Sequence, residues 1–388
     1  WGGDWMASKS SLLIGIGSRV RKSPYFDSTI KYGVTGFTVY NKMYLPTGFT
    51  NPEKEYNSLI RDVTFGDFAA ERQVEVSGPD AFNFIKYINP RNLSKFNIGD
   101  CKYIILTDSD GGIVNDACLI RLEEDKFWVS PGDGDALLWL QGIAMNSGMN
   151  VSICEPDVSP LQVSGPKAGK LIQKLFNGRH DDLGYYKAAQ TSLENIPMVI
   201  ARTGWSGELS YELYLQDRKL GNNLFELVYE AAKEFNGAVI APNNIRTIEG
   251  GLLSYGSDFG REHNPYTIGL DRLVDIDQDI DFIGKKALKK IKETGAASKL
   301  IGVEMDGAPI DKVPENFWPV FDKNGNKVGR LSRCFYSPRL KKNIGLAIVD
   351  SSSTEEGNKV IVESPQIKYN AIVAKLPWFP AEKDTNLL

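Results

Sequence analysis

The sequence predicts an α+β protein in which a large domain with antiparallel sheets precedes a small domain made almost entirely of strands. Three observations support this prediction. The chain has 388 residues, which is enough for two or three domains. A strand–Ser-Gly-Pro–helix pattern occurs twice in the first half of the chain, which indicates an internal duplication. Beyond Lys299 the pattern is nearly all strand and turn.

The repeated pattern begins with a strand that alternates apolar and polar residues. Gln73–Gly78 alternates in this way, and Pro79–Ile88 follows with apolar residues at helical spacing. Leu161–Pro166 and Lys167–Phe176 repeat the same order of strand and helix. We therefore expect two related α+β units inside one domain that covers residues 33–283.

A glycine pair, Gly111-Gly112, predicts a hairpin between strands Tyr103–Leu106 and Ala117–Leu122. Asn115 and Asp116 stand where the returning strand begins. Because successive strand residues point to opposite faces, these two side chains are expected on opposite sides of the sheet. An ordinary polar surface turn explains the same residues, and the pattern alone leaves this choice open.

A second hairpin is expected where strand Ile196–Ala201 leads through two glycines into strand Leu209–Leu215. Its turn and returning strand gather large aromatic rings and carboxylates, namely Trp205, Glu208, Tyr211, Glu212 and Tyr214. A hairpin of this composition can stack a flat ring and form hydrogen bonds to its edge. The alternative, that the rings only pack the core of a sheet, stays open from these residues alone.

The second half of the chain continues with an amphipathic helix over roughly Asn222–Phe235 and a basic helix over Gly284–Gly295. The small second domain is expected over residues 299–375. Its predicted strands are Leu300–Met305, Ile344–Val349 and Lys359–Val362, with a hairpin at Asn324-Gly325. A small β-barrel and a β-sandwich both fit this pattern.

Composition argues against several classes of function. The formal net charge of -4 makes a general role in binding nucleic acid unexpected, and no apolar run is long enough to cross a membrane. The four cysteines are scattered, as is typical of reduced thiols in the cytoplasm. His180 and His263 are the only histidines and stand far apart, so neither a metal site nor histidine-based nucleophilic catalysis is expected.

Several motifs, taken together, resemble those of the glycine-cleavage T-protein (aminomethyltransferase) family. In order, they are the Ser-Gly-Pro element at 76–81, Gly-Gly-Ile-Val-Asn-Asp at 111–116, Thr-Gly-Trp-Ser-Gly-Glu at 203–208 with Tyr211-Glu212, Ile248–Leu252 with Tyr255-Gly256, and Ser337-Pro338 with Asn343–Gly345. Their order and spacing extend from Gly33 to Val373. The resemblance implies a folate-binding domain of duplicated α+β units, a C-terminal β-barrel and a homodimer.

Three further segments are similar to one branch of this family, the dimethylsulfoniopropionate demethylases. They are Tyr40–Pro46, Glu71–Glu75 and Glu249–Gly256. That branch moves a methyl group from a sulfonium to tetrahydrofolate. The resemblance therefore implies a cytoplasmic demethylase without a metal, which converts dimethylsulfoniopropionate and tetrahydrofolate into 3-methylthiopropionate and 5-methyltetrahydrofolate.

The resemblance also implies the residues of the site. The expected folate contacts are Tyr103, Asn115, Ala117, Trp205 and Glu212. Glu212 suits the pterin because a carboxylate accepts two parallel hydrogen bonds from its 2-amino-pyrimidine edge. Asn115, by orienting N5, and Trp205 are the expected catalytic residues. The sulfonium is expected against the aromatic faces of Trp205, Tyr214 and Tyr40, and the substrate carboxylate against Lys42 or Arg72.

Two departures from the family pattern bear on the substrate. The T-protein has an aspartate where this chain has Asn115, and an arginine where this chain has Asn243, which puts one contact to the folate tail in doubt. A sulfonium leaves as a neutral sulfide and needs no general acid, so Asn115 favours demethylation. An aminomethyltransferase or methylated-glycine demethylase of the same fold stays an alternative, and so does a non-enzymatic folate-binding protein.

Overall fold

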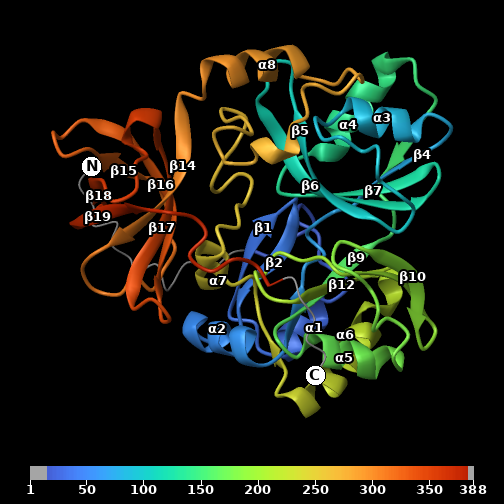
Figure 1. The fold of residues 1–388 in the computed structure, drawn as a ribbon. Coiled ribbons are helices and arrows are strands. Elements are labelled where there is room, and N and C mark those ends of the chain that lie inside the picture. The colour runs from blue at the N-terminus through green and yellow to red at the C-terminus, as the bar shows by residue number, and fades with distance from the viewer. Residues whose placement is uncertain (1–14, 383–388) are drawn as a thin grey trace.

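The structure is a computed structural model that describes residues 15–382. Three lobes surround a common centre: a five-stranded sheet with its helices, a six-stranded sheet with its helices, and a closed barrel (Figure 1). The arrangement confirms the predicted α+β class with antiparallel sheets. Within residues 15–382, no helix is long and apolar enough to cross a membrane.

The five-stranded sheet is antiparallel, with strand order β5-β6-β7-β4-β8. Its strands are β4 (Val74–Ser77), β5 (Cys101–Thr107), β6 (Ile113–Glu123), β7 (Lys126–Pro131) and β8 (Ser152–Cys154). Helices α3 (Ala81–Tyr87) and α4 (Ala136–Ser147) cover one face and bury Phe84 and Phe127 completely. The predicted hairpin at Gly111-Gly112 joins β5 to β6.

The six-stranded sheet has the order β10-β11-β12-β9-β3-β13, and only the short β13 runs parallel to its neighbour. Its strands are β3 (Thr64–Asp67), β9 (Ser159–Ser164), β10 (Ala188–Leu193), β11 (Ile196–Ala201), β12 (Ser210–Leu215) and β13 (Ala238–Val239). Helices α5 (Ala168–Phe176) and α6 (Gly221–Ala232) cover one face, where Leu171 and Phe225 are fully buried.

The uncovered faces of the two sheets pack against each other. Trp128 on one sheet meets Tyr214 on the other, with ring centroids 6.0 Å apart. Side chains alternate along β12, so Tyr211 points toward α5 and α6 while Tyr214 points between the sheets. Glu212 lies two residues before Tyr214 and therefore points to the same inter-sheet face.

The duplication predicted from the Ser-Gly-Pro pattern is present in the backbone. β4 with α3 and β9 with α5 occupy equivalent places, one pair in each sheet. Gly78 and Gly165 stand at the same point of each pair and have nearly the same φ, +117° and +120°. A side chain at Gly165 would place its Cβ 2.5 Å from the carbonyl oxygen of Asp62. This turn therefore requires glycine both for its positive φ and for lack of space.

The C-terminal lobe is a closed six-stranded barrel. Its order is β14-β17-β16-β15-β18-β19, with strands β14 (Ser298–Met305), β15 (Trp318–Phe321), β16 (Lys327–Ser337), β17 (Lys342–Asp350), β18 (Lys359–Glu363) and β19 (Lys368–Ala374). Pairing of β14 with β19 closes it, which decides between barrel and sandwich. Val303, Leu331 and Val349 fill its interior.

The remaining elements connect the lobes. They are α1 (Phe26–Lys31), β1 (Gly36–Tyr40), β2 (Met43–Gly48), α2 (Pro52–Arg61), η2 (Arg218–Leu220), η3 (Lys233–Phe235), α7 (Asn244–Glu249), η4 (Asp271–Leu273), α8 (Lys285–Thr294) and η5 (Ser351–Ser353). The β1–β2 hairpin and α7 lie near the centre of the molecule (Figure 1). The segment after β19 returns from the barrel to this centre, where the amide of Trp378 donates to the carbonyl of Glu249.

Candidate active site

A large cavity occupies the centre where the three lobes meet. Its volume is about 1100 Å³, and its walls come from both sheets, the β1–β2 hairpin, the loop after α7 and the barrel. Five of the residues expected at the site line it: Tyr40, Tyr103, Ala117, Trp205 and Glu212. The tertiary fold therefore brings together side chains that are up to 172 positions apart in the sequence.

Glu212 supplies a buried carboxylate at the inter-sheet wall of the cavity, with only 3% of its surface exposed. One carboxylate oxygen, Oε2, accepts hydrogen bonds from the hydroxyls of Thr203 and Tyr214, the latter at 2.9 Å. Burial raises the pKa of Glu212. The other oxygen, Oε1, has no hydrogen-bond partner among the described residues, so it is the one that can accept from N–H donors at the edge of a ligand.

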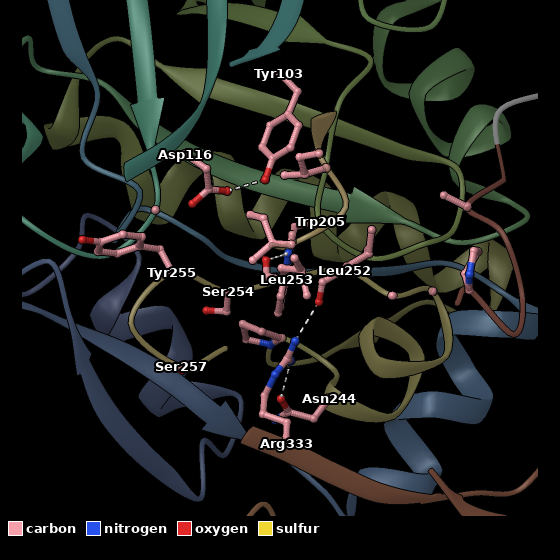
Figure 2. A pocket seen from close by; sticks show the side chains of 18 of the residues that line it. Tyr103, Asp116, Trp205, Asn244, Leu252, Leu253, Ser254, Tyr255, Ser257 and Arg333 are labelled. Carbon is pink, nitrogen blue, oxygen red and sulfur yellow. Dashed lines mark hydrogen bonds between the residues drawn. The ribbon is translucent and has the colours of Figure 1, made fainter. Parts of the chain in front are cut away.

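Asp116 lines the cavity where sequence reasoning expected Asn115. The Tyr103 hydroxyl donates to its Oδ2 at 2.7 Å, as Figure 2 shows, and burial raises the pKa of Asp116 to about 6. Asn115 is not among the lining residues, because alternation along β6 turns its side chain to the other face. There its Nδ2 donates to the carbonyl of Asp133 at 2.7 Å.

Tyr214 and Lys42 also lie outside the cavity wall. Tyr214 is completely buried between the sheets, where it orients the Glu212 carboxylate instead of offering a face to a ligand. Lys42 is exposed and pairs with Asp135 at 2.9 Å. Its alternative, Arg72, pairs with Glu155 and donates to the carbonyl of Asn41 at 3.3 Å. Neither basic residue lines the cavity.

Other cations line the cavity instead, and no sequence motif pointed to them. Arg272, Lys299 and Lys375 all line it, and none of the three forms an ion pair with a described residue. Arg272 lies in η4, beside β5 and close to Tyr103. The two lysines belong to the barrel side, one in β14 and one just after β19. These three are the candidates for carboxylate groups of the ligands.

Trp205 is held rigidly at the cavity wall. Its backbone N–H donates to Oε1 of Gln162 at 2.9 Å, and its indole Nε1 donates to the carbonyl of Leu253 at 3.0 Å (Figure 2). The turn depends on Gly207, whose φ is +79° and which has no room for a Cβ beside the Arg246 guanidinium. The indole ring therefore cannot swing away from the cavity without losing a buried hydrogen bond.

Arg333 reaches from the barrel to the same place and lies over the Trp205 ring, with its guanidinium carbon 5.5 Å from the ring centroid. It forms a buried ion pair with Asp258 at 2.6 Å and donates to the carbonyl of Leu252 at 2.7 Å (Figure 2). Because a cation already occupies this aromatic neighbourhood, Trp205 is better suited to stack a neutral ring than to hold a second cation.

Glu71 is a cavity residue that sequence reasoning missed as a site residue. It follows β3 in the segment that connects the two sheets, and its Oε2 accepts a hydrogen bond from Ser130 at 3.1 Å. Burial, and then the charge of Glu212, raise the pKa of Glu71 well above its usual range. The only sequence signal was its place beside Arg72 in a segment that resembles the demethylase branch.

Asn243, which replaces an arginine of the family pattern, has a structural role. Its side-chain oxygen accepts from the backbone N–H of Arg246 at 3.1 Å and so caps α7. Arg246 in turn pairs with Glu208 at 2.6 Å, which ties α7 to the Trp205 turn. Asn243 does not line the cavity, whereas its neighbour Asn244 does.

Comparison with known proteins gives two matches to family models. The GCVT N-terminal domain matches residues 25–278, and the glycine cleavage T-protein C-terminal barrel domain matches residues 299–380. The dimethylsulfoniopropionate demethylase DmdA of Ruegeria pomeroyi is 35% identical over 89% of this chain and 94% of its own length. An aminomethyltransferase of Alkaliphilus metalliredigens is 29% identical over 87% of this chain and 95% of its own length.

Among solved structures, the glycine cleavage system aminomethyltransferase T of Bartonella henselae superimposes with a TM-score of 0.84 at 21% identity, covering 94% of this chain and 99% of that chain. This likeness shows that the fold is shared. The two family models together cover both domains in the expected order. The chain therefore belongs to the glycine cleavage T-protein family.

Proposed function

We propose that this protein transfers a methyl group from the sulfonium of dimethylsulfoniopropionate to N5 of tetrahydrofolate. The 35% identity to a demethylase over most of both chains supports a folate-dependent methyltransferase of this family. The observation that carries the finer proposal is the composition of the cavity wall, where an aromatic ring and several carboxylates face the same space. A flat folate ring and a compact cation are the ligands that such a wall suits.

The residues present fit a bound pterin. The Glu212 carboxylate is buried and held in place by Thr203 and Tyr214, and one of its oxygens has no partner among residues 15–382. The fixed Trp205 ring supplies a face for stacking. Asp116, rather than Asn115, stands in the cavity beside Tyr103 and takes the role of orienting N5. Arg272, Lys299 or Lys375 receives the carboxylates of substrate and folate tail.

Tetrahydrofolate supplies the N5 lone pair that forms the new N–CH₃ bond, while the C–S bond breaks and its electron pair stays on sulfur. The N5 proton is released to water. Positive charge is dispersed and not created in this step, so the protein mainly aligns the two reactants. Correct alignment alone lowers a barrier by about 7–11 kcal/mol in well-oriented systems. This explains how a cavity without a histidine near its reacting atoms could support the reaction.

The test is to incubate the protein with tetrahydrofolate and dimethylsulfoniopropionate and to follow 5-methyltetrahydrofolate and 3-methylthiopropionate by chromatography. Both products must appear in equal amounts. The parallel reaction with a methylated glycine addresses the alternative within the family, to which the similarity to aminomethyltransferases also points. Product from the methylated glycine alone would refute the sulfonium proposal, and binding of folate without any product would favour a non-enzymatic role.

A further inference from the structure

We propose that the Glu71 carboxylate is the group that selects a positively charged substrate, by facing its onium centre across the cavity. This inference rests on the proposed function, because it assigns the substrate cation to a particular wall. Three observations carry it: the position in which Glu71 is held, the sign of the charges around it, and the ring that stands beside it.

Glu71 is held by a directed chain of hydrogen bonds. Nε2 of Gln73 donates to Oγ of Ser130 at 2.9 Å and also to the backbone carbonyl of Glu71. Because the Ser130 oxygen accepts from Gln73, its proton is free to point at the Glu71 carboxylate, 3.1 Å away. Only one oxygen of Glu71 is used in this way within the described residues, and the side chain lines the cavity.

The carboxylates of Glu212 and Asp116 line the same cavity as Glu71. The charged neighbours that act on it are Glu212 and Asp116. Arg72, the next residue, turns away from the cavity to pair with Glu155. Three carboxylates thus line the same cavity, and no basic residue within 15–382 pairs with Glu71. Within the same residues, Oδ1 of Asp116 is buried without a hydrogen bond. Burial raises the pKa of each of these carboxyl groups, and a compact cation beside them would favour their ionised forms.

Glu71 is the carboxylate of the three that is left for the cation. Glu212 accepts hydrogen bonds from the hydroxyls of Thr203 and Tyr214, and its remaining oxygen is the one proposed for the pterin edge. Asp116 accepts a hydrogen bond from the Tyr103 hydroxyl. In the part of the chain that the structure describes, the side-chain partner of Glu71 is the neutral Ser130 hydroxyl alone.

An aromatic ring stands beside this carboxylate. Nδ2 of Asn41 donates to the carbonyl of Ala70 at 3.0 Å, which brings the chain at Tyr40 beside the chain at Glu71, and both side chains line the cavity. In keeping with this, burial and then the charge of Glu71 raise the pKa of Tyr40 well above its usual range. A ring face next to a carboxylate attracts an onium group through cation–π and charge interactions together. On the other side, the guanidinium of Arg333 already lies over the Trp205 ring.

The test compares a cation with a neutral molecule of the same shape. Dimethylsulfoniopropionate and 4-methylpentanoate differ in having S⁺ or C–H at the branch point. Their dissociation constants are measured by calorimetry on the full chain saturated with 5-methyltetrahydrofolate, which cannot accept a further methyl group at N5. The wild-type protein should bind the cation more tightly than the neutral acid. Glu71→Gln, whose amide oxygen still accepts from Ser130, should reduce that preference by about tenfold or more.

The matched control is Asp135→Asn, which removes a carboxylate outside the cavity wall and should leave the preference unchanged. No preference in the wild-type protein, an unchanged preference in Glu71→Gln, or an equal loss in the control would overturn the inference. Failure of the proposed function is a separate result, because it is the absence of 5-methyltetrahydrofolate in the turnover assay. Methyl transfer with an unaltered preference in Glu71→Gln would keep the function and reject the role of Glu71.

Discussion

Replacing Glu212 by glutamine should weaken folate binding without weakening the fold. The carboxylate is 97% buried, since 3% of its surface is exposed, and the two hydroxyls that it accepts from, those of Thr203 and Tyr214, both reach Oε2. A glutamine carbonyl can accept both bonds in the same place. Its amide group then faces the cavity, where it presents donors to the donors of the pterin edge.

The size of the effect follows from the number and charge of the bonds lost. A hydrogen bond to a charged group contributes about 1.5–3 kcal/mol, which corresponds to roughly 10- to 150-fold in Kd. The free energy of unfolding should not fall together with the folate affinity. Glu212→Gln removes a buried charge and its repulsion with Glu71, so the free energy of unfolding should stay the same or rise.

The difference in unfolding free energy between the variant and the wild type should depend on pH, because Glu212 titrates and glutamine does not. Burial raises the pKa of Glu212 in the folded chain, so the wild-type protein loses stability as pH rises through that pKa. Glutamine does not titrate, and the advantage of the variant in unfolding free energy should therefore grow from acidic to alkaline pH. This is measured by urea denaturation at several pH values, and folate affinity by calorimetry. Unchanged folate affinity, or a variant less stable than the wild type, would refute the reasoning.

Three further predictions follow from the same wall. Arg333→Met leaves Asp258 buried without its cation and should lower the free energy of unfolding by about 3–5 kcal/mol; a loss below about 1 kcal/mol in urea denaturation would show that the pair does not hold the barrel in place. Trp205→Ala should raise KM for tetrahydrofolate by about tenfold, or abolish turnover, with an intact circular dichroism spectrum, because the pterin loses its stacking face; unaltered kinetics would remove Trp205 from the site. Burial raises the pKa of Asp116 to about 6, and in the proposed role its ionised form accepts the hydrogen bond that orients N5. Demethylation kcat/KM should therefore fall as pH is lowered through about 6, and Asp116→Asn should flatten that part of the profile.

Local pattern was sufficient to predict most elements of this chain. The glycine pair at 111–112 and Asn324-Gly325 each make the hairpins that their sequences predict, because these turns need conformations that glycine adopts easily. The repeated Ser-Gly-Pro element likewise produces the same turn twice, with matching glycine conformations at Gly78 and Gly165. Local sequence could not decide between a barrel and a sandwich, because the barrel closes only when β14 pairs with β19, far along the chain.

The sequence by itself determined which residue types were available and, through the family pattern, that Glu212 and Trp205 share one hairpin. Only the tertiary structure decided which side of a strand faces the cavity. Because side chains alternate with a period of two, a single step along β6 exchanges Asn115 for Asp116, and packing of the two sheets turns Tyr214 inward onto Glu212. Glu71 belongs to the segment that connects the two sheets, and it lines the cavity because the fold places this segment there. No spacing in the sequence encodes that placement.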